Sequence, residues 1–145
     1  MLVEEEIIIN APADKVYQIV KDMGRYPEFI PSLKEVTVLE NGPGYTVTKW
    51  VSKVQSFTLQ WTERDTFFDE ERRVEYKLVE GAMKKFEGKW IVEPQTDGTT
   101  KVHLDVDFEL AMPALRDFLG PMAKKIMRDS LKSLLQGIKA ESERV

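Results

Sequence analysis

The chemistry open to this chain is restricted first by its scarce reactive side chains. The 145 residues include one histidine, His103, and no cysteine, so disulfides, thiolate metal ligands and cysteine nucleophiles are excluded. Histidine is the side chain best suited to acid–base chemistry near neutral pH, which makes His103 the first candidate for a catalytic role. With one histidine and no cysteine, a metal site would have to consist almost entirely of carboxylates.

Carboxylates follow His103 at alternate positions, as Asp105, Asp107 and Glu109. In a strand this spacing places them on one face, as a hard-cation site or a paired acid and base requires. The residues between them are apolar, so the strand has a buried face and a wet face, and His103 lies on the wet one. We therefore expect a solvated outer face that pairs with lysines such as Lys89, with no metal site and no Ser-His-Asp triad.

Glu63 continues the inward row of Phe57, Leu59 and Trp61 on another strand. A carboxylate in this position is either a polar group at the mouth of a cavity or a strand-end group that leaves the core. We favour the strand-end interpretation.

The elements that position these residues follow from the apolar periodicity. A first strand is expected over residues 3 to 10, followed by a helix that ends at Gly24 and a short helical turn within residues 24 to 31. Alternation then predicts six strands, at about 33 to 40, 45 to 54, 56 to 66, 72 to 80, 85 to 93 and 99 to 110. Their short connections predict an antiparallel meander. The inward face of residues 45 to 54 stays open, because both possible rows mix apolar and polar side chains.

The C-terminal residues 113 to 145 form an amphipathic pattern, with apolar side chains every three or four positions. Gly120 and Pro121 interrupt it, which predicts a lead-in turn at about 113 to 118 and a main helix from Pro121 to about Ala140. The opposite face is basic, and we interpret it as a solvated helix face rather than a binding surface. Its charged residues are Lys124, Lys125, Arg128, Lys132 and Lys139.

The composition predicts a soluble, cytoplasmic protein with a single domain over residues 1–145, large enough for a core with an internal pocket. The net charge of −4 argues against DNA as a partner, because nucleic-acid binding relies on phosphate neutralisation. The N-terminus does not resemble a secretory signal, and no apolar run of about 18 residues exists to span a membrane.

Two short motifs accompany this order of elements: Tyr26-Pro27-Glu28-Phe29-Ile30-Pro31 and Phe86-Glu87-Gly88-Lys89-Trp90. Over essentially its whole length the chain resembles the START-like (SRPBCC) superfamily. It is most similar to the polyketide cyclase/dehydrase group that also holds coenzyme Q-binding proteins and ribosome-association toxins. One departure is Ser32-Leu33, where the coenzyme Q-binding and toxin relatives commonly carry an aromatic residue and a cysteine.

The resemblance implies an α+β helix-grip fold, in which a curved seven-stranded antiparallel sheet wraps around a long C-terminal helix, with two short helices between strands 1 and 2. It also implies a hydrophobic cavity between helix, sheet and the short turn. Inward aromatic residues and the helix level of Met122 are expected to line this cavity, while the later level of Leu131, Leu134 and Ile138 closes it. The expected ligand-binding residues are Phe29, Trp61, Tyr76, Trp90, Phe108, Met122 and Ile126.

The leading functional interpretation is the binding or transport of a hydrophobic small molecule, such as a lipid, an isoprenoid quinone or a polyketide-like aromatic. It involves no catalytic residue, cofactor or metal. One alternative is a cyclase or aromatase, in which Tyr26, Tyr76 or Glu63 would exchange protons. Another is a module that binds the ribosome or a protein partner through the basic helix face or the short turn.

Overall fold

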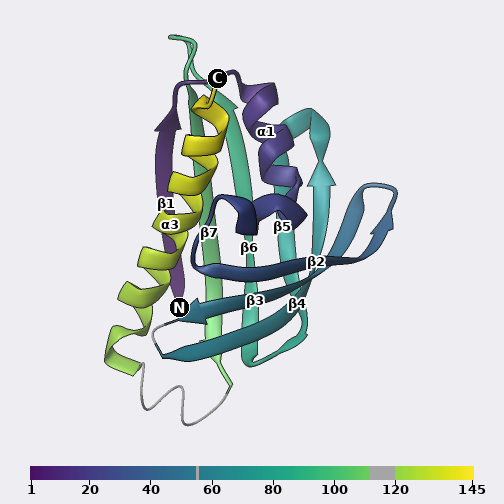
Figure 1. Ribbon diagram of the computed structural model, residues 1–145, viewed down its shortest axis with the longest axis vertical. Coiled ribbons are helices and arrows are strands. Elements are labelled where there is room, and N and C mark those ends of the chain that lie inside the picture. The colour runs from purple at the N-terminus through teal and green to yellow at the C-terminus, as the bar shows by residue number, and fades with distance from the viewer. Residues whose placement is uncertain (55, 112–119) are drawn as a thin grey trace.

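The computed structural model describes residues 1–54, 56–111 and 120–145. A seven-stranded antiparallel sheet curves around a long C-terminal helix (Figure 1). The strands are β1 (Leu2–Ile9), β2 (Leu33–Gly42), β3 (Tyr45–Val54), β4 (Phe57–Phe68), β5 (Arg73–Gly81), β6 (Met83–Pro94) and β7 (Thr100–Leu110). The helices are α1 (Ala13–Lys21) and α3 (Ala123–Glu143), with the short 3-10 helices η1 (Met23–Glu28), η2 (Asp69–Glu71) and η3 (Gly120–Met122).

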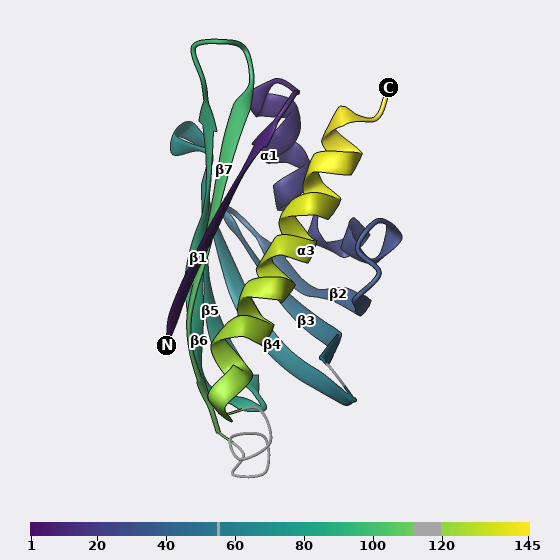
Figure 2. The same cartoon turned by 90° about the vertical axis from the view of Figure 1, so that its left-hand side faces the viewer.

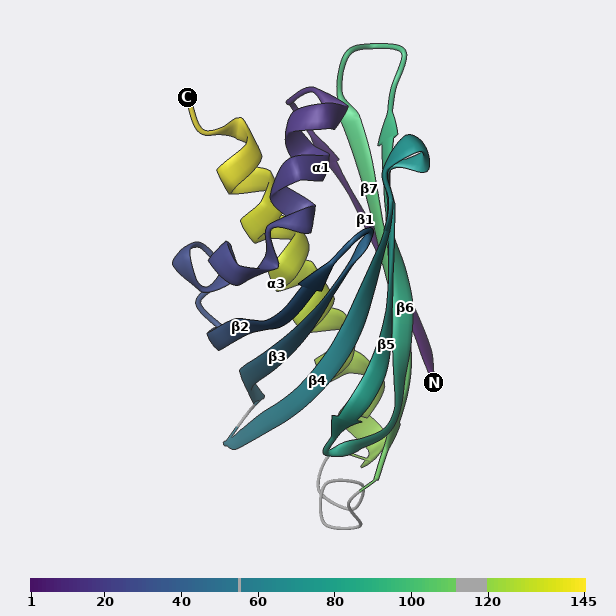
Figure 3. The same ribbon diagram turned by 90° about the vertical axis from the view of Figure 1, so that its right-hand side faces the viewer.

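The strand order in the sheet is β1-β7-β6-β5-β4-β3-β2, and all neighbours are antiparallel. Strands β2 to β7 therefore form the predicted meander, and β1 returns to pair with β7. Each strand boundary differs from the predicted one by at most two residues. The sheet is strongly twisted: β2, β3 and β4 run across the direction of β1 and β5 to β7 and curl beneath α3 (Figures 1 and 3).

The core lies between the concave face of the sheet and the helical elements α1, η1 and α3, which cover that face (Figure 2). The apolar row of β7 is buried from Val102 to Leu110, so the predicted alternation is confirmed. From α3, Leu131, Leu135 and Ile138 pack into the same core. Gly137 allows α3 to approach the segment after η1, because a β-carbon there would lie 2.5 Å from Ile30 Cγ1.

The main C-terminal helix begins at Ala123, after η3, and continues to Glu143, three residues beyond the predicted end. The lead-in turn predicted at about 113 to 118 lies outside the described residues. Among the helices of the described ranges, none has the combined length and apolar content needed to cross a membrane.

The structure settles the face of β3 that the sequence left open. Trp50 pairs with Trp61 of β4 and points inward, together with Thr48 and Ser52. The inward row of β3 is thus partly polar. Hydroxyl groups are tolerated there because they form hydrogen bonds inside the protein, as described below.

Candidate ligand-binding site

An apolar pocket lies between the curled strands and the middle of α3. The sheet contributes Trp50, Leu59 and Trp61 to its lining, and α3 contributes Met127, Leu131 and Leu134, among others. The cavity has a volume of about 70 Å³. Pockets that hold drug-sized ligands have volumes of roughly 300 to 1,000 Å³. A ligand of that size therefore requires the lining side chains to move.

Three serines give the lining its polar groups. Ser32 comes from the segment before β2, Ser52 from β3 and Ser130 from α3. Small hydroxyl groups in an apolar wall orient a ligand without excluding its hydrocarbon part. The combination suits a molecule that is mostly apolar and carries few polar atoms.

Aromatic rings form one wall of this region. The indoles of Trp50 and Trp61 stack with centroids 5.7 Å apart and planes 9° from parallel. Trp61 also contacts Phe86 at 5.2 Å, and Phe86 contacts Tyr76 at 5.5 Å. Tyr26 packs edge-on against Trp50 at 5.6 Å. Such ring contacts hold the stack in place.

Beside this wall, two carboxyl groups are buried on the inward face of β4. Glu63 is 3% exposed and Asp65 is 0% exposed. Trp61 Nε1 donates to Glu63 Oε1 at 2.8 Å. The hydroxyls of Thr48 and Thr46 donate to Asp65 Oδ2 at 2.7 and 3.1 Å.

The expectation that Glu63 leaves the core is therefore wrong. Strand β4 extends to Phe68, two residues farther than predicted, so Glu63 lies in the strand interior and not at its end. Continuing the inward alternation of Phe57, Leu59 and Trp61 by two steps gives Glu63 and Asp65. That signal was available in the sequence for Asp65 as well.

Burial shifts the pKa of both groups in the pair. It raises the pKa of Glu63 well above the ordinary value of 4.5, and the nearby Asp65 raises it further. Burial also raises the pKa of Asp65, although hydrogen bonds from Glu63, Thr48 and Thr46 oppose that rise. Burial and the proximity of the two carboxyl groups therefore both favour a proton on the pair, and the pKa of Glu63 is the one raised most strongly.

The phenols of Tyr26 and Tyr76 face this pair from η1 and β5. Burial, with the neighbouring carboxyl groups, raises the pKa of each well above 10.0. The Tyr26 hydroxyl donates to the Val20 carbonyl at 2.5 Å, and the Tyr76 hydroxyl donates to the Asp105 carbonyl. Because each phenol already donates its one hydroxyl proton to a backbone carbonyl, neither donates a hydrogen bond to a ligand in the pocket.

The structure distributes the sequence-predicted ligand residues over several places. Trp61 lines the pocket. Tyr76, Trp90 and Phe108 point inward as expected and are buried in the core, but they do not belong to the pocket lining. Phe29 is half-buried beside Tyr26 and borders a separate surface groove next to α3.

The two predicted helix residues do not form the expected wall. Met122 is 55% exposed, which contradicts its expected inward direction. It belongs to η3, so the four-residue spacing of an α-helix does not relate it to Ile126. Ile126 is partly buried against the core. The pocket lies instead at the level of Met127 and Leu131. Leu131 belongs to the level that was expected from the sequence to close the cavity.

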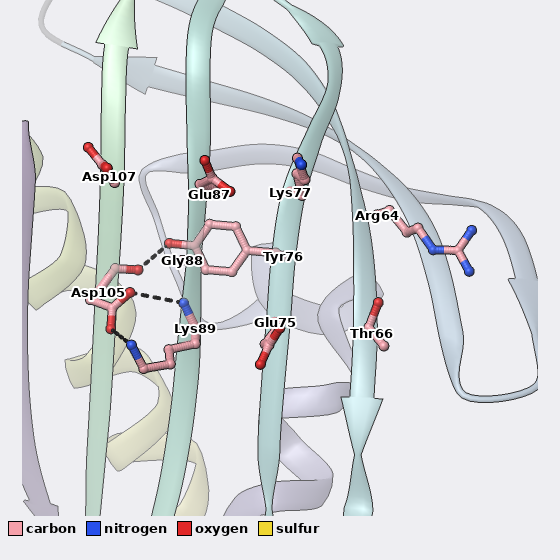
Figure 4. A pocket seen from close by; sticks show the side chains of 10 residues that line it. All are labelled: Arg64, Thr66, Glu75, Tyr76, Lys77, Glu87, Gly88, Lys89, Asp105 and Asp107. Carbon is pink, nitrogen blue, oxygen red and sulfur yellow. Dashed lines mark hydrogen bonds and ion pairs between the residues drawn. The ribbon is translucent and has the colours of Figure 1, made fainter.

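The outer face of the sheet carries a second, charged hollow of about 520 Å³ (Figure 4). Lys89 Nζ lies 2.8 Å from Asp105 Oδ2, and Lys85 Nζ lies 2.8 Å from Asp107 Oδ2. The predicted pairing of outer carboxylates with lysines is confirmed. His103 lies on this face, but only 18% of its side chain is exposed, and its Nε2 lies 2.7 Å from Asp105 Oδ2.

The backbone hydrogen-bond ladder between β6 and β7 is interrupted at Asp105, where side-chain groups take part in the hydrogen bonds. The Lys89 backbone N–H donates to Asp105 Oδ1, while the Asp105 carbonyl accepts from the Tyr76 hydroxyl (Figure 4). Gly88 makes room for this exchange, because a β-carbon there would collide with the Asp105 carbonyl oxygen. Glu4, His103 and Asp105 have ligand atoms within 4.8 Å of one another. Since Lys89 already supplies positive charge at Asp105, we assign this cluster to the surface ion pairs.

Residues 9–135 match the polyketide cyclase/dehydrase and lipid transport family, and the chain therefore belongs to that family. Its fold is similar to that of a START superfamily protein from Mycobacterium smegmatis, with 22% identity and a TM-score of 0.82 over 98% of this chain and 97% of that one.

Three similar proteins illustrate the range of the family. The ribosome association toxin RatA of Pseudomonas aeruginosa is 25% identical over 120 residues, which cover 83% of this chain and 83% of that protein. The actinorhodin polyketide synthase bifunctional cyclase/dehydratase of Streptomyces coelicolor is 31% identical over 116 residues, covering 76% of this chain and 36% of that protein. The crystal structure of TTHA0849 from Thermus thermophilus is 26% identical with a TM-score of 0.92, covering 98% of this chain and 97% of that one.

Proposed function

We propose that the protein binds an apolar small molecule in the pocket between β2–β4 and α3. The observation that carries this proposal is the pocket lining, in which a stacked indole pair faces leucines and a methionine and only three serines are polar. Methionine is a flexible side chain that adapts to ligands of different shape, so Met127 suits a wall that must yield. Membership of a family described by lipid transport is consistent with this function.

The arrangement favours a carrier over a cyclase. His103 lies on the outer face, and the hydroxyls of Tyr26 and Tyr76 are committed to backbone carbonyls. Tyr26, Tyr76 and Glu63 are the residues that were expected from the sequence to exchange protons in a cyclase. Of these, only Glu63 has an acid–base group near the pocket that is not committed to a backbone carbonyl.

Two measurements test the carrier function. Native mass spectrometry of freshly purified protein should show additional mass from a bound apolar molecule. In titrations, the fluorescent probe N-phenyl-1-naphthylamine should bind the parent protein. The variant Met127→Trp should lose this binding, because the larger ring fills the pocket at a stability cost of about 1 to 3 kcal/mol.

The matched control is Met122→Trp, which adds the same ring at an exposed position. It should bind the probe as the parent does. If the parent binds no probe, or if the two variants behave alike, the pocket is not a ligand site.

A second candidate function is association with the ribosome, which rests on the similarity to RatA. The basic face of α3 gives it little support, because Arg128 and Lys132 both lie within 4 Å of Glu5, and Lys125 pairs with Asp129. Cosedimentation with ribosomes at low and high salt tests this candidate. Binding that weakens with salt and survives Met127→Trp would favour ribosome association over ligand carriage.

A further inference from the structure

The buried pair Glu63 and Asp65 is not explained by packing. Among the described residues, no cation pairs with either group, and the two carboxyl groups are held in the interior by hydrogen bonds from Trp61, Thr46 and Thr48. An uncompensated buried charge is costly. Asp65 Oδ1 is buried and has no hydrogen-bond partner among the described residues.

The pair is rich in hydrogen-bond acceptors. Together the two carboxyl groups have four oxygen atoms. Their donors are Trp61 Nε1 and the hydroxyls of Thr46 and Thr48, and Asp65 Oδ1 has no partner among the described residues. The pair can therefore accept a further donor.

Trp61 connects this pair to the pocket. Its indole lines the cavity, and the N–H of the same indole donates to Glu63 Oε1. The cavity of about 70 Å³ must enlarge before it holds a ligand. Rotation of this one indole would enlarge the cavity and, by the same movement, leave Glu63 Oε1 without its donor.

We propose that Glu63 and Asp65 form the polar end of the ligand site, and that they select an apolar ligand with a hydroxyl or phenol group, whose O–H replaces the Trp61 N–H at Glu63. The inference rests on the proposed carrier function and specifies its ligand class. Ligands that offer only acceptors, such as ethers or ketones, would leave Glu63 unsatisfied. Carboxylate ligands would place a negative charge beside two buried carboxyl groups.

The test compares three probes of nearly equal shape. 2-Naphthol offers a donor, 2-methoxynaphthalene offers only an acceptor, and 2-methylnaphthalene offers neither. Calorimetric titration of the parent should show 2-naphthol binding at least about tenfold more tightly than the other two, as expected for a site that is satisfied only by a donor.

The position of Trp61 gives a readout that does not depend on affinity. The indole N–H signal of Trp61 in a nitrogen–proton correlation spectrum, assigned with Trp61→Phe, should shift strongly on addition of 2-naphthol because its hydrogen bond to Glu63 breaks. Trp61→Phe itself keeps a ring but removes the donor. It should therefore bind 2-naphthol more tightly than the parent does.

Substitutions of Glu63 separate the chemistry from the packing. Glu63→Leu removes the acceptor and should abolish the preference for 2-naphthol, whereas Glu63→Gln keeps an acceptor oxygen and should retain part of it. Glu87→Leu, the same replacement on the outer face, should leave the preference unchanged. If Glu63→Leu does not fold, the probe comparison and the indole shift in the parent still decide whether Glu63 and Asp65 form the polar end of the ligand site.

The outcomes distinguish the proposed ligand class from the proposed carrier function on which it rests. Equal affinities for the three probes, with an unmoved Trp61 signal, would overturn the assignment of the polar end and leave the carrier function standing. Failure of all three probes to bind would overturn both.

Discussion

Glu63→Gln should change how the stability of the protein depends on pH. In the parent, burial raises the pKa of Glu63 well above 4.5. Between pH 4.5 and that raised value, the folded state keeps a proton that the unfolded state has released. Because the folded state holds more protons in this window, the free energy of unfolding falls as pH rises, by up to about 1.4 kcal/mol per pH unit.

The glutamine variant has no proton to lose at this position. Its amide N–H can donate to Asp65 at every pH, as the protonated Glu63 does in the parent. The free energy of unfolding of the variant should therefore not fall with pH on account of this position. The variant should become more stable relative to the parent from pH 5 upward, until the pH reaches the raised pKa of Glu63. The titrations of groups remote from the pair are common to the two proteins and cancel in the difference, whereas Asp65, which interacts directly with Glu63, also contributes to it.

Urea unfolding at pH 5, 6, 7 and 8 measures this difference, provided that the slope with urea stays the same. Glu87→Gln provides the control for an amide on the outer face and should follow the parent. Parallel stability curves for the parent and Glu63→Gln between pH 5 and 8 would contradict the raised pKa of Glu63 in the folded protein.

Three further substitutions test the packing by urea unfolding. Trp90→Ala should cost about 3 to 5 kcal/mol, because it removes a buried ring from the core, and an unchanged midpoint would contradict this position. His103→Ala should cost about 1 kcal/mol, because Asp105 loses one partner and keeps Lys89, whereas no loss would mean that His103 does not support Asp105. Gly88→Ala should cost about 3 kcal/mol, since its β-carbon would meet a backbone carbonyl oxygen, while Gly120→Ala, whose β-carbon would meet no atom of the described residues within 4 Å apart from its chain neighbours, should be nearly neutral.

The sequence predicted the fold where the two faces of a strand differ clearly. Apolar and polar residue types alternate along β7 from Val102 to Leu110, so its inward face could be assigned from local pattern alone. The burial of Asp105 in the polar row was not visible in that pattern. Strand β3 could not be assigned in this way, because its inward face contains Thr46 and Thr48. Their inward position depends on Asp65 in the neighbouring strand, and a single strand does not show its neighbour.

The site was less predictable, because its position depends on where helix α3 begins. Apolar spacing suggested that Met122 continues the inward stripe, but η3 precedes the α-helix and turns Met122 toward solvent. The pocket consequently lies one level later, at Met127. The buried role of Glu63 was missed for a related reason, since its burial depends on the full length of β4.

The close contact between Gly137 and Ile30 has a consequence for the motion of α3. Near this contact the helix is also held by Lys139, which donates to the Ile8 carbonyl, and by Glu143, which accepts from the Asn10 N–H. In the half that lines the pocket, the described residues link α3 to β1 through the ion pairs of Arg128 and Lys132 with Glu5. Both basic side chains are about half exposed, and surface ion pairs of this kind restrain a helix only weakly. Amide hydrogens should accordingly exchange with solvent more slowly in the last turns of α3 than around Met127, and a ligand should enter by local opening of the less restrained half while the other half stays folded.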